Sequence, residues 1–287
     1  MTSNPVVTLS SGTVEAVIDA DHGARLSSLC FDGQEILLQR SDNDSLSWGC
    51  YPMVPWAGRM RDATFVHHGV THHVPGDRDP LLAPHAIHGL VYNAPWKIID
   101  ASATSAILRI DFDHRWPFAG WVEQLVSVDA SSIEMRLTVF MNDPAMQKVA
   151  QTAMHTDMPA QVGWHPWFVR PVQLEAAFKS MYVRDSAGIA TTQVVTPTTL
   201  QLTGQTPSPL DDCFTDADAP PTLTFGNGLI VRLESDCSHW VVYNKPAHAI
   251  CVEPQSGPPN GLNSEPLAVL PNQPLTRNFR LTALGYP

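Results

Sequence analysis

The sequence predicts an all-β protein, a single large antiparallel β-sandwich. Several runs alternate apolar and polar residues with period two, as strands with one buried face do. No run has convincing helical periodicity, and strand–helix–strand alternation is absent. The chain also has 25 prolines against 17 lysines and arginines, which favours strands and turns over long helices. With 287 residues, one domain covering residues 1–287 is expected.

The predicted strands follow this alternation along the chain. It is clearest at Leu108, Ile110 and Phe112, at Ile133, Met135, Leu137 and Val139, and at Leu229, Val231 and Leu233. Further strands are expected near residues 13–19, 24–31, 34–39, 97–102, 121–129, 148–155, 249–254 and 275–284, with turns at Asp32-Gly33, His68-Gly69 and Gly226-Asn227-Gly228. Residues 174–181 hold at most a turn or two of helix, and the proline-rich stretches 205–221 and 254–274 are expected to be ordered loops.

Composition excludes several classes of protein. A formal net charge of −11 argues against a nucleic-acid surface and against a basic membrane patch. No apolar run approaches ~20 residues, and the N-terminal residues lack the pattern of a signal peptide. Cysteines stand at Cys30, Cys50, Cys213, Cys237 and Cys251, without a CxxC pair, which is typical of a reduced protein. We therefore expect a cytoplasmic protein, monomeric or homodimeric, that binds neither nucleic acid nor membrane.

The segment Val162-Gly163-Trp164-His165-Pro166-Trp167-Phe168 is the strongest candidate for a site. Three aromatic rings surround one imidazole, and the proline biases His165 toward an extended conformation at a strand end. Such rings suit a sugar, whose C–H faces stack on them while its hydroxyl groups need polar partners. The alternative is a histidine packed in an aromatic core.

Two more segments carry polar side chains on tight loops. In residues 51–62, two prolines, a tryptophan and a glycine place Arg59 on a stiff loop, where it can donate several hydrogen bonds. The alternative, a surface arginine paired with Asp62, fits Arg61 better. In residues 85–90, Gly89 lets the chain turn tightly beside His88. A metal pair of His85 and His88 is a minority alternative, because no thiolate or carboxylate lies nearby at ligand spacing.

Carboxylates stand out at two places. Asp211 and Asp212 follow Pro209, a position where paired carboxylates do acid–base work, bind a cation or, most often, cap a turn. Glu253 closes an apolar strand before Pro254, so its carboxylate is expected at a strand end facing a loop-lined cleft. Partial desolvation there would raise its pKa and make it a usable general base. A strand-end glutamate in water is the alternative.

Four histidines, His67, His68, His72 and His73, surround a predicted hairpin turn. Alternation sends neighbours to opposite faces and leaves at most two imidazoles on each side. We interpret them as solvent-facing hairpin histidines, with metal binding a minority alternative.

Taken together, the segments resemble the aldose 1-epimerase (galactose mutarotase) family. The residues that carry the resemblance are Pro55-Trp56-Ala57-Gly58-Arg59-Met60-Arg61-Asp62, His85-Ala86-Ile87-His88-Gly89-Leu90, Gly163-Trp164-His165-Pro166-Trp167-Phe168, Leu210-Asp211-Asp212-Cys213-Phe214 and Glu253-Pro254, in matching order over about residues 12–284. The resemblance implies a large supersandwich with a cleft across one sheet. Gly89-Leu90, Gly58 and residues 255–260 depart from the family pattern, which bears on the sugar more than on the chemistry.

The resemblance also implies roles for individual residues. Glu253 corresponds to the general base and His165 to the general acid, while His88, Arg59 and Asp211 correspond to residues that hold sugar hydroxyls or the ring oxygen. Trp167 is expected to offer its ring to the sugar. The expected reaction, interconversion of the α and β anomers of an aldohexose, needs no metal, nucleotide or redox cofactor.

Other functions remain open from the sequence. The substrate could be an anionic sugar, a hexose 6-phosphate or sulfonated sugar, met by one of the arginines Arg59, Arg61, Arg78 and Arg170. A non-catalytic sugar-binding sandwich would use the same cleft without an acid–base pair. A hydrolase or lyase would need a second catalytic carboxylate, for which Asp211 is the candidate.

Overall fold

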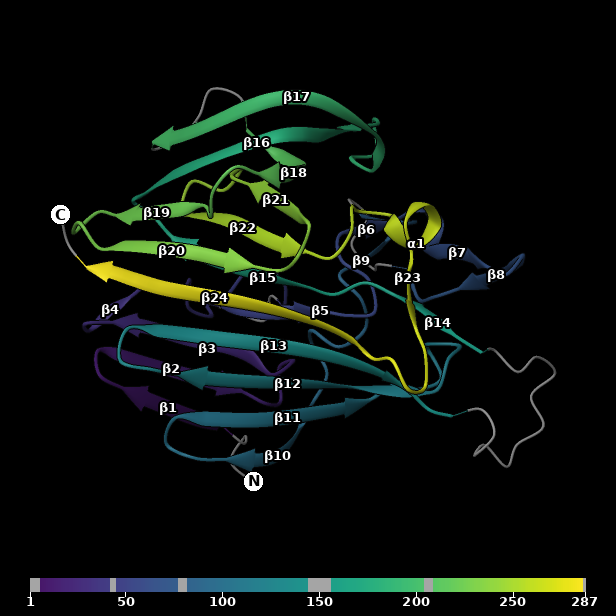
Figure 1. Ribbon diagram of the computed structural model, residues 1–287, viewed down its shortest axis with the longest axis horizontal. Helices are drawn as coiled ribbons and strands as arrows, with labels where there is room; N and C mark the ends of the chain where they lie inside the picture. Colours follow the sequence, from purple (N-terminus) through teal and green to yellow (C-terminus); the bar gives the residue numbers. More distant parts are fainter. Residues whose placement is uncertain (1–5, 42–44, 77–81, 144–155, 204–208, 286–287) are drawn as a thin grey trace.

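The described residues are built almost entirely from antiparallel strands (Figure 1). The computed structural model describes residues 6–41, 45–76, 82–143, 156–203 and 209–285. The elements are β1 (Val6–Ser11), β2 (Val14–Asp19), β3 (Arg25–Phe31), β4 (Gln34–Glu35), β5 (Cys50–Met53), β6 (Arg59–Met60), the 3-10 turn η1 (Arg61–Ala63), β7 (Thr64–His67), β8 (Val70–His73), β9 (Ala86–Ile87), β10 (Lys97–Ala101), β11 (Ser105–Asp111), β12 (Gly120–Val128), β13 (Ser132–Met141), β14 (Met158–Ala160), β15 (Gly163–Val169), β16 (Val172–Arg184), β17 (Ala190–Thr203), β18 (Asp211–Ala217), β19 (Thr222–Phe225), β20 (Ile230–Ser235), β21 (His239–Tyr243), β22 (Ala249–Gln255), α1 (Gly261–Ser264), β23 (Leu267–Val269) and β24 (Leu275–Gly285).

The strands form two layers that share one long strand (Figure 1). The first layer runs in the order β1-β2-β3-β5-β15-β22-β21-β18-β16-β17. The second runs β10-β11-β12-β13-β24-β20-β19-β16. Strand β16 is long enough to pair with β18 in one layer and with β19 in the other, so the two layers are continuous. This confirms the all-β sandwich expected from the sequence.

The core between the layers is filled by alternate side chains of each strand. On β15, Trp164 and Phe168 are fully buried, and Trp164 contacts Phe279 of β24 with ring centroids 5.8 Å apart. Burying aromatic side chains of this size contributes on the order of 1.5–3 kcal/mol each. Because strand side chains alternate, His165 and Trp167 of β15 point to the opposite, outer face. The sandwich core therefore also fixes which side chains of β15 face outward.

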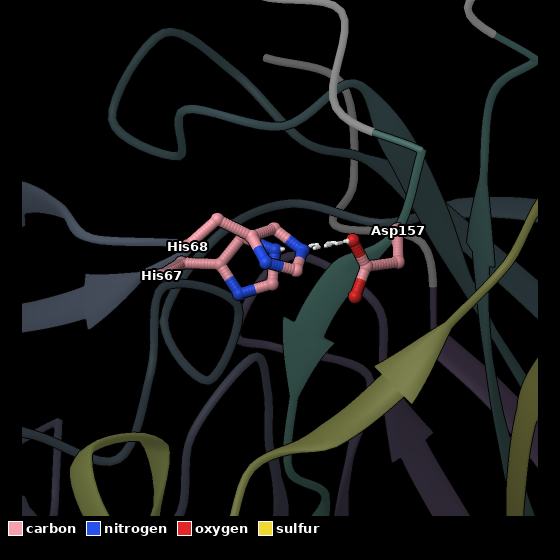
Figure 2. Close-up of side chains that lie close together, drawn as sticks. All are labelled: His67, His68 and Asp157. Atoms are coloured by element: carbon pink, nitrogen blue, oxygen red, sulfur yellow. Dashed lines mark hydrogen bonds and ion pairs between the residues drawn. The ribbon is translucent and has the colours of Figure 1, made fainter.

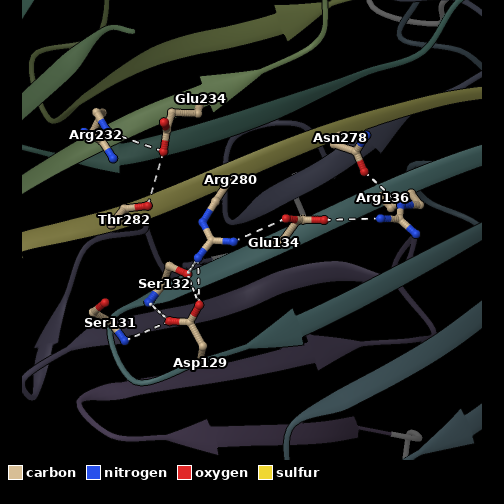
Figure 3. Close-up of polar contacts among 10 residues, drawn as sticks. All are labelled: Asp129, Ser131, Ser132, Glu134, Arg136, Arg232, Glu234, Asn278, Arg280 and Thr282. Carbon is tan, nitrogen blue, oxygen red and sulfur yellow. Dashed lines mark hydrogen bonds and ion pairs between the residues drawn. The ribbon is translucent and has the colours of Figure 1, made fainter.

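The outer face of the second layer carries polar ladders across β13, β24 and β20 (Figure 3). Arg280 lies opposite Glu134 on the neighbouring strand, and its guanidinium nitrogens approach the carboxylates of Glu134 at 3.4 Å and Asp129 at 2.7 Å. Arg136 donates to Asn278 at 2.8 Å. This face is a solvated surface, and exposed pairs of this kind contribute about 0–1 kcal/mol each to the stability of the fold.

Most of the strands predicted by alternation are confirmed. The run predicted at 34–39 shortens to β4, Gln34–Glu35, and the strand predicted at 148–155 lies outside the described residues. The possible helix at 174–181 is wrong, because these residues belong to β16, where Leu174, Ala176 and Phe178 face the core. Pairing along both edges of β16 overrides the helix propensity of its alanines. The loop predicted at 205–221 is wrong over Asp211–Ala217, which is β18.

Helix is scarce in the described ranges, where the α-helix α1 spans four residues. None of the helices in the part of the chain that the structure describes has the length and apolar character needed to cross a membrane.

Candidate active site

His165 and Glu253 meet on the outer face of the first layer. Strands β15 and β22 pair in a register that joins Gly163 to Gln255 and Trp167 to Cys251, which sets His165 opposite Glu253. The His165 Nε2 and Glu253 Oε1 atoms lie 3.3 Å apart. Both residues are buried, at 5% and 2% exposure. The alternative that Glu253 is a strand-end glutamate in water is therefore excluded.

The imidazole of His165 is held between aromatic rings. Tyr51, opposite it on β5, stacks with ring centroids 4.9 Å apart, and Trp167 stacks on the other side at 5.1 Å. His88 meets the ring edge-on at 4.8 Å. These contacts restrain the orientation of the His165 ring, as a proton donor or acceptor requires.

Burial shifts the pair toward its uncharged forms. Burial, together with His88 and Arg25, holds the pKa of His165 well below the usual imidazole value. Burial, together with the negative Asp211, raises the pKa of Glu253 well above the usual carboxyl value. A hydrogen bond of 3.0 Å from Gln255 Nε2 to Glu253 Oε2 opposes the second shift without cancelling it. The free protein therefore favours a neutral carboxylic acid beside a neutral imidazole, which share one proton.

A cavity of about 210 Å³ opens in front of the pair. The polar and aromatic residues that line it include Tyr51, Arg59, His88, His165, Trp167, Arg184, Asp211, Tyr243, Lys245, Glu253 and Gln255. Polar and aromatic groups that converge on one concave site are typical of small-molecule sites. All six residues singled out from the sequence, Glu253, His165, His88, Arg59, Asp211 and Trp167, line this one cavity.

Buried polar atoms without a partner gather around this cavity. Among the described residues, Tyr51 Oη, His88 Nδ1, His165 Nδ1, Trp167 Nε1 and Gln255 Oε1 are buried and make no hydrogen bond. A buried polar group without a partner costs about 1–3 kcal/mol, so a cluster of them needs an explanation. A bound ligand with several hydroxyl groups would provide hydrogen-bond partners for these atoms.

Asp211 organises the charged side of the cavity. Its Oδ2 atom lies 3.0 Å from Lys245 Nζ, 3.4 Å from Arg59 Nη1 and 3.8 Å from Arg184 Nη1. Asp212 accepts from Arg184 Nε at 2.6 Å. The turn suggested for Asp211 and Asp212 is wrong, since both belong to β18 and pair with β21. Sequence reasoning missed Arg184 and Lys245, which lie in no recognisable motif.

His88 sits on a sharp turn of the chain. The φ angles of His88 and Gly89 are 57° and 80°, and a Cβ atom on Gly89 would lie 2.0 Å from the carbonyl oxygen of Val54. The tight turn predicted at Gly89 is thus confirmed. Burial, and then the positive Arg59, lower the pKa of His88 from 6.5 to about 3. His88 is therefore a neutral imidazole at physiological pH.

Behind Tyr51 lies a buried arginine that the sequence did not single out. The guanidinium of Arg25 donates to the carbonyl oxygens of His22, Trp48, Ser45 and Tyr92 at 2.7–3.1 Å. It stacks over Trp48 and Tyr51, 4.0 Å and 4.8 Å from the ring centroids. Burial lowers its pKa to about 10, so it stays charged. Arg25 thus supports the ring on which His165 stacks.

The other arginines considered from the sequence lie elsewhere. The alternative of a surface arginine paired with Asp62 is wrong for Arg61, because its guanidinium pairs with Asp185. Arg170 donates to the carbonyl oxygen of Ala249 at 3.1 Å and does not line the cavity. Arg78 lies outside the described residues.

Two clusters of three potential metal ligands occur among the described residues, and neither contains His85 or His88. One is His67, His68 and Asp157, outside this cavity. The other is His165, Cys251 and Glu253. Burial, and then Glu253, hold the pKa of the Cys251 thiol well above its usual range. A metal binds the thiolate, so the neutral thiol disfavours a metal centre here.

Comparison with known proteins gives the family of the chain. The aldose 1-epimerase family model matches residues 5–281. No curated protein sequence matched the chain.

Several solved structures share the fold. An aldose epimerase homologue from C. elegans has a TM-score of 0.80 at 14% identity, covering 99% of each chain. A galactose 1-epimerase from Lactobacillus acidophilus NCFM has a TM-score of 0.77 at 14% identity, covering 99% of this chain and 96% of that one. A galactose mutarotase-like protein from Clostridium acetobutylicum has a TM-score of 0.76 at 16% identity, covering 97% and 94%. The structures show the common fold, and the family match over nearly the whole length shows that this chain belongs to the aldose 1-epimerase family of isomerases.

Proposed function

We propose that the protein is a mutarotase that interconverts the α and β anomers of a free aldohexose, with Glu253 as general base and His165 as general acid. The observation that carries the proposal is the buried carboxyl–imidazole pair, 3.3 Å apart, that lines a cavity surrounded by polar and aromatic side chains. Membership of the aldose 1-epimerase family supports it.

Ring opening requires two proton transfers at neighbouring atoms. A base removes the proton of the C1 hydroxyl group while an acid protonates the ring oxygen, and the bond from C1 to the ring oxygen breaks. Rotation about C1–C2 and closure on the other face then give the second anomer. Both oxygens are bonded to C1, so base and acid must be neighbours. The spacing of Glu253 and His165 suits such a pair.

The pair carries one proton throughout the cycle. Before ring opening, Glu253 is a carboxylate and His165 an imidazolium. After opening, Glu253 holds the proton from the C1 hydroxyl and His165 is neutral. The two forms differ only in where the protons sit, and closure reverses the roles. Burial favours the uncharged form in the free protein, so the ionic form that starts the reaction becomes populated when the sugar hydroxyls solvate it.

The remaining lining suits a polyhydroxylated ring. The unpartnered atoms of Tyr51, His88 and Trp167 can donate to or accept from sugar hydroxyls. Arg59 and Asp211 offer a donor and an acceptor at the other side of the cavity. We propose that these residues hold the sugar while Glu253 and His165 act on C1.

An anionic sugar is the second candidate substrate. Arg59, Arg184 and Lys245 line the cavity together with Asp211 and the largely protonated Glu253, and Asp212 pairs with Arg184 beside it. Positive charge therefore exceeds negative charge on that side, which favours a phosphate or sulfonate group away from C1. Asp211, held by three cations, is poorly suited to act as the acid of a glycosidase.

We further propose that the enzyme works in the cytoplasm without a cofactor. All five cysteines are free thiols, four of them buried, which supports a reducing compartment. The acid–base step is complete with the two side chains.

Polarimetry of freshly dissolved sugars tests the proposal. Wild-type protein should accelerate the change in rotation of α-glucose or α-galactose, and His165→Asn should not. Acceleration with glucose 6-phosphate or a 6-sulfonated glucose only would select the anionic alternative. Binding of sugars without acceleration of any would contradict an enzyme and favour a sugar-binding module.

A further inference from the structure

We propose that His67, His68 and Asp157 form a binding site for a divalent transition-metal ion of the zinc type, separate from the candidate active site. The three side chains converge, and their ligand atoms lie within 4.8 Å of one another (Figure 2). None of the three lines the candidate active-site cavity. The site would be a second function of the fold, independent of sugar chemistry.

The hairpin turn brings two adjacent histidines to the same side. Strands β7 and β8 pair up to His67 and Val70, and His68 and Gly69 form the two-residue connection. Their φ angles are 48° and 76°, both left-handed as in a type I′ turn. Strand alternation ends at His67, so the His68 ring folds back to 4.1 Å from the His67 ring, centroid to centroid. The expectation of four solvent-facing histidines is thus wrong for His67, which is 8% exposed.

The third side chain comes from a different part of the sheet. Asp157 immediately precedes β14, and its Oδ1 atom lies 3.3 Å from His67 Nε2 and 2.7 Å from His68 Nε2. Phe118 packs edge-on against His67 with centroids 5.3 Å apart and closes one side with an apolar wall. Two segments about ninety residues apart in sequence therefore present three ligands to one point.

The donor set and spacing suit zinc. Two imidazole nitrogens and one carboxylate oxygen are typical of zinc and related ions, whereas calcium and magnesium prefer oxygen ligands only. With bonds near 2.0–2.1 Å, tetrahedral ligand atoms lie about 3.3 Å apart. The His67–Asp157 distance already matches, and the 2.7 Å His68–Asp157 distance must widen slightly. The His68 side chain is 61% exposed and can move.

The turn tolerates a histidine at position 68, because asparagine, aspartate and histidine are the residues most often found with left-handed φ. Core packing does not account for its ring, since the His68 side chain is 61% exposed. By contrast, His72 stacks on Phe65 with centroids 5.0 Å apart, so its ring serves packing.

The same contacts without a metal would be a hydrogen-bonded histidine–aspartate cluster that ties the hairpin to β14. Metal titration of the full-length chain separates the two interpretations. Zn²⁺ is titrated into chelator-treated protein by calorimetry, and Co²⁺ is added to follow its visible absorption bands, which report nitrogen and oxygen ligands at low coordination number.

The variants are His68→Asn and Asp157→Asn, with His73→Asn as the matched control. Asparagine tolerates the left-handed φ of residue 68, so His68→Asn removes the ligand and keeps the turn. His73 is exposed at the far end of the same hairpin. Glu253→Gln is included because His165, Cys251 and Glu253 form the other cluster.

We expect one equivalent of Zn²⁺ per wild-type chain, with unchanged affinity in His73→Asn and Glu253→Gln. Affinity should fall by more than about tenfold in both His68→Asn and Asp157→Asn, since these lose a direct ligand. Absence of stoichiometric binding by the wild type, or full affinity in both ligand variants, would overturn the proposal. Loss of binding in Glu253→Gln alone would overturn it by moving the ion to the candidate active site.

Discussion

Replacing His88 with asparagine should make the protein less sensitive to acid. His88 is 6% exposed, and burial followed by Arg59 lowers its pKa to about 3. The unfolded chain takes up this proton near pH 6.5, long before the folded protein does. The stability that comes from keeping His88 neutral is therefore complete above pH 6.5 and is lost as the pH falls from 6.5 toward 3.

The size of the effect follows from the two pKa values. Between pH 7 and pH 4.5 the unfolded His88 binds close to one proton and the folded His88 binds almost none. At about 1.36 kcal/mol per pH unit below 6.5, the wild type should lose about 2.5 kcal/mol of unfolding free energy through this residue alone. This loss of unfolding free energy changes little as long as the pKa of His88 in the folded protein stays below 4.5.

Urea unfolding at pH 7.0, 5.5 and 4.5 measures the effect. Asparagine tolerates the left-handed φ of 57° at position 88, so the backbone should be kept. The variant should lose about 2.5 kcal/mol less stability than the wild type between pH 7.0 and 4.5, while His73→Asn, which removes an exposed imidazole, should follow the wild type. The contribution of Glu253 is common to all three proteins and cancels. His88 also lowers the pKa of His165, so its removal reduces the acid sensitivity that comes from His165 and acts in the same direction. Parallel losses in His88→Asn and wild type would refute a buried, neutral His88.

Three further outcomes are expected. The pH–rate profile should have two limbs. The catalysed rate should fall on the acid side below pH 6.5, where His165 adds a second proton to the pair, and on the alkaline side above pH 4.5, where Glu253 loses the only proton. An acid limb centred above pH 6.5 would contradict this order. Gly89→Ala should lower the unfolding free energy by more than about 2 kcal/mol in guanidinium melts and abolish activity, because the added Cβ would lie 2.0 Å from the Val54 carbonyl oxygen. Wild-type stability and activity in this variant would show that the backbone can shift without loss of stability. Arg25→Met should lower the unfolding free energy by at least about 3 kcal/mol in the same melts, since four carbonyl groups lose their hydrogen-bond donor. A loss of less than about 1 kcal/mol would argue against the buried guanidinium network.

The fold was predictable where strands alternate cleanly and hidden where they do not. Strands β11, β13 and β20 alternate in sequence and in burial. Strand β17 was missed because much of its length is exposed on both faces, and exposed strands carry no period-two pattern. Strand β18 was missed because Asp211 and Asp212 look like turn residues, although cations on neighbouring segments hold both carboxylates.

The site was predictable to the extent that its residues lie in recognisable segments. Strand register brings His165 and Glu253 together, and register cannot be read from the sequence. Each residue could still be singled out, because each precedes a proline in a strand of aromatic or apolar residues. Arg184 and Lys245 reach the cavity from a strand end and a loop without any motif. The hairpin histidines were misread because the alternation rule holds within strands and fails at a turn with left-handed residues.

Anomer exchange at equilibrium tests the acid–base pair most directly. Saturation of one anomeric proton of glucose by NMR reports its transfer to the other anomer, with wild type and Glu253→Gln compared at equal concentration. Glutamine keeps the volume and neutrality of the protonated Glu253, so the variant should melt like the wild type. We predict transfer well above the buffer rate for the wild type and a loss of at least about 100-fold in the variant. Equal rates in the two proteins, both above buffer, would contradict the role of Glu253 as the base.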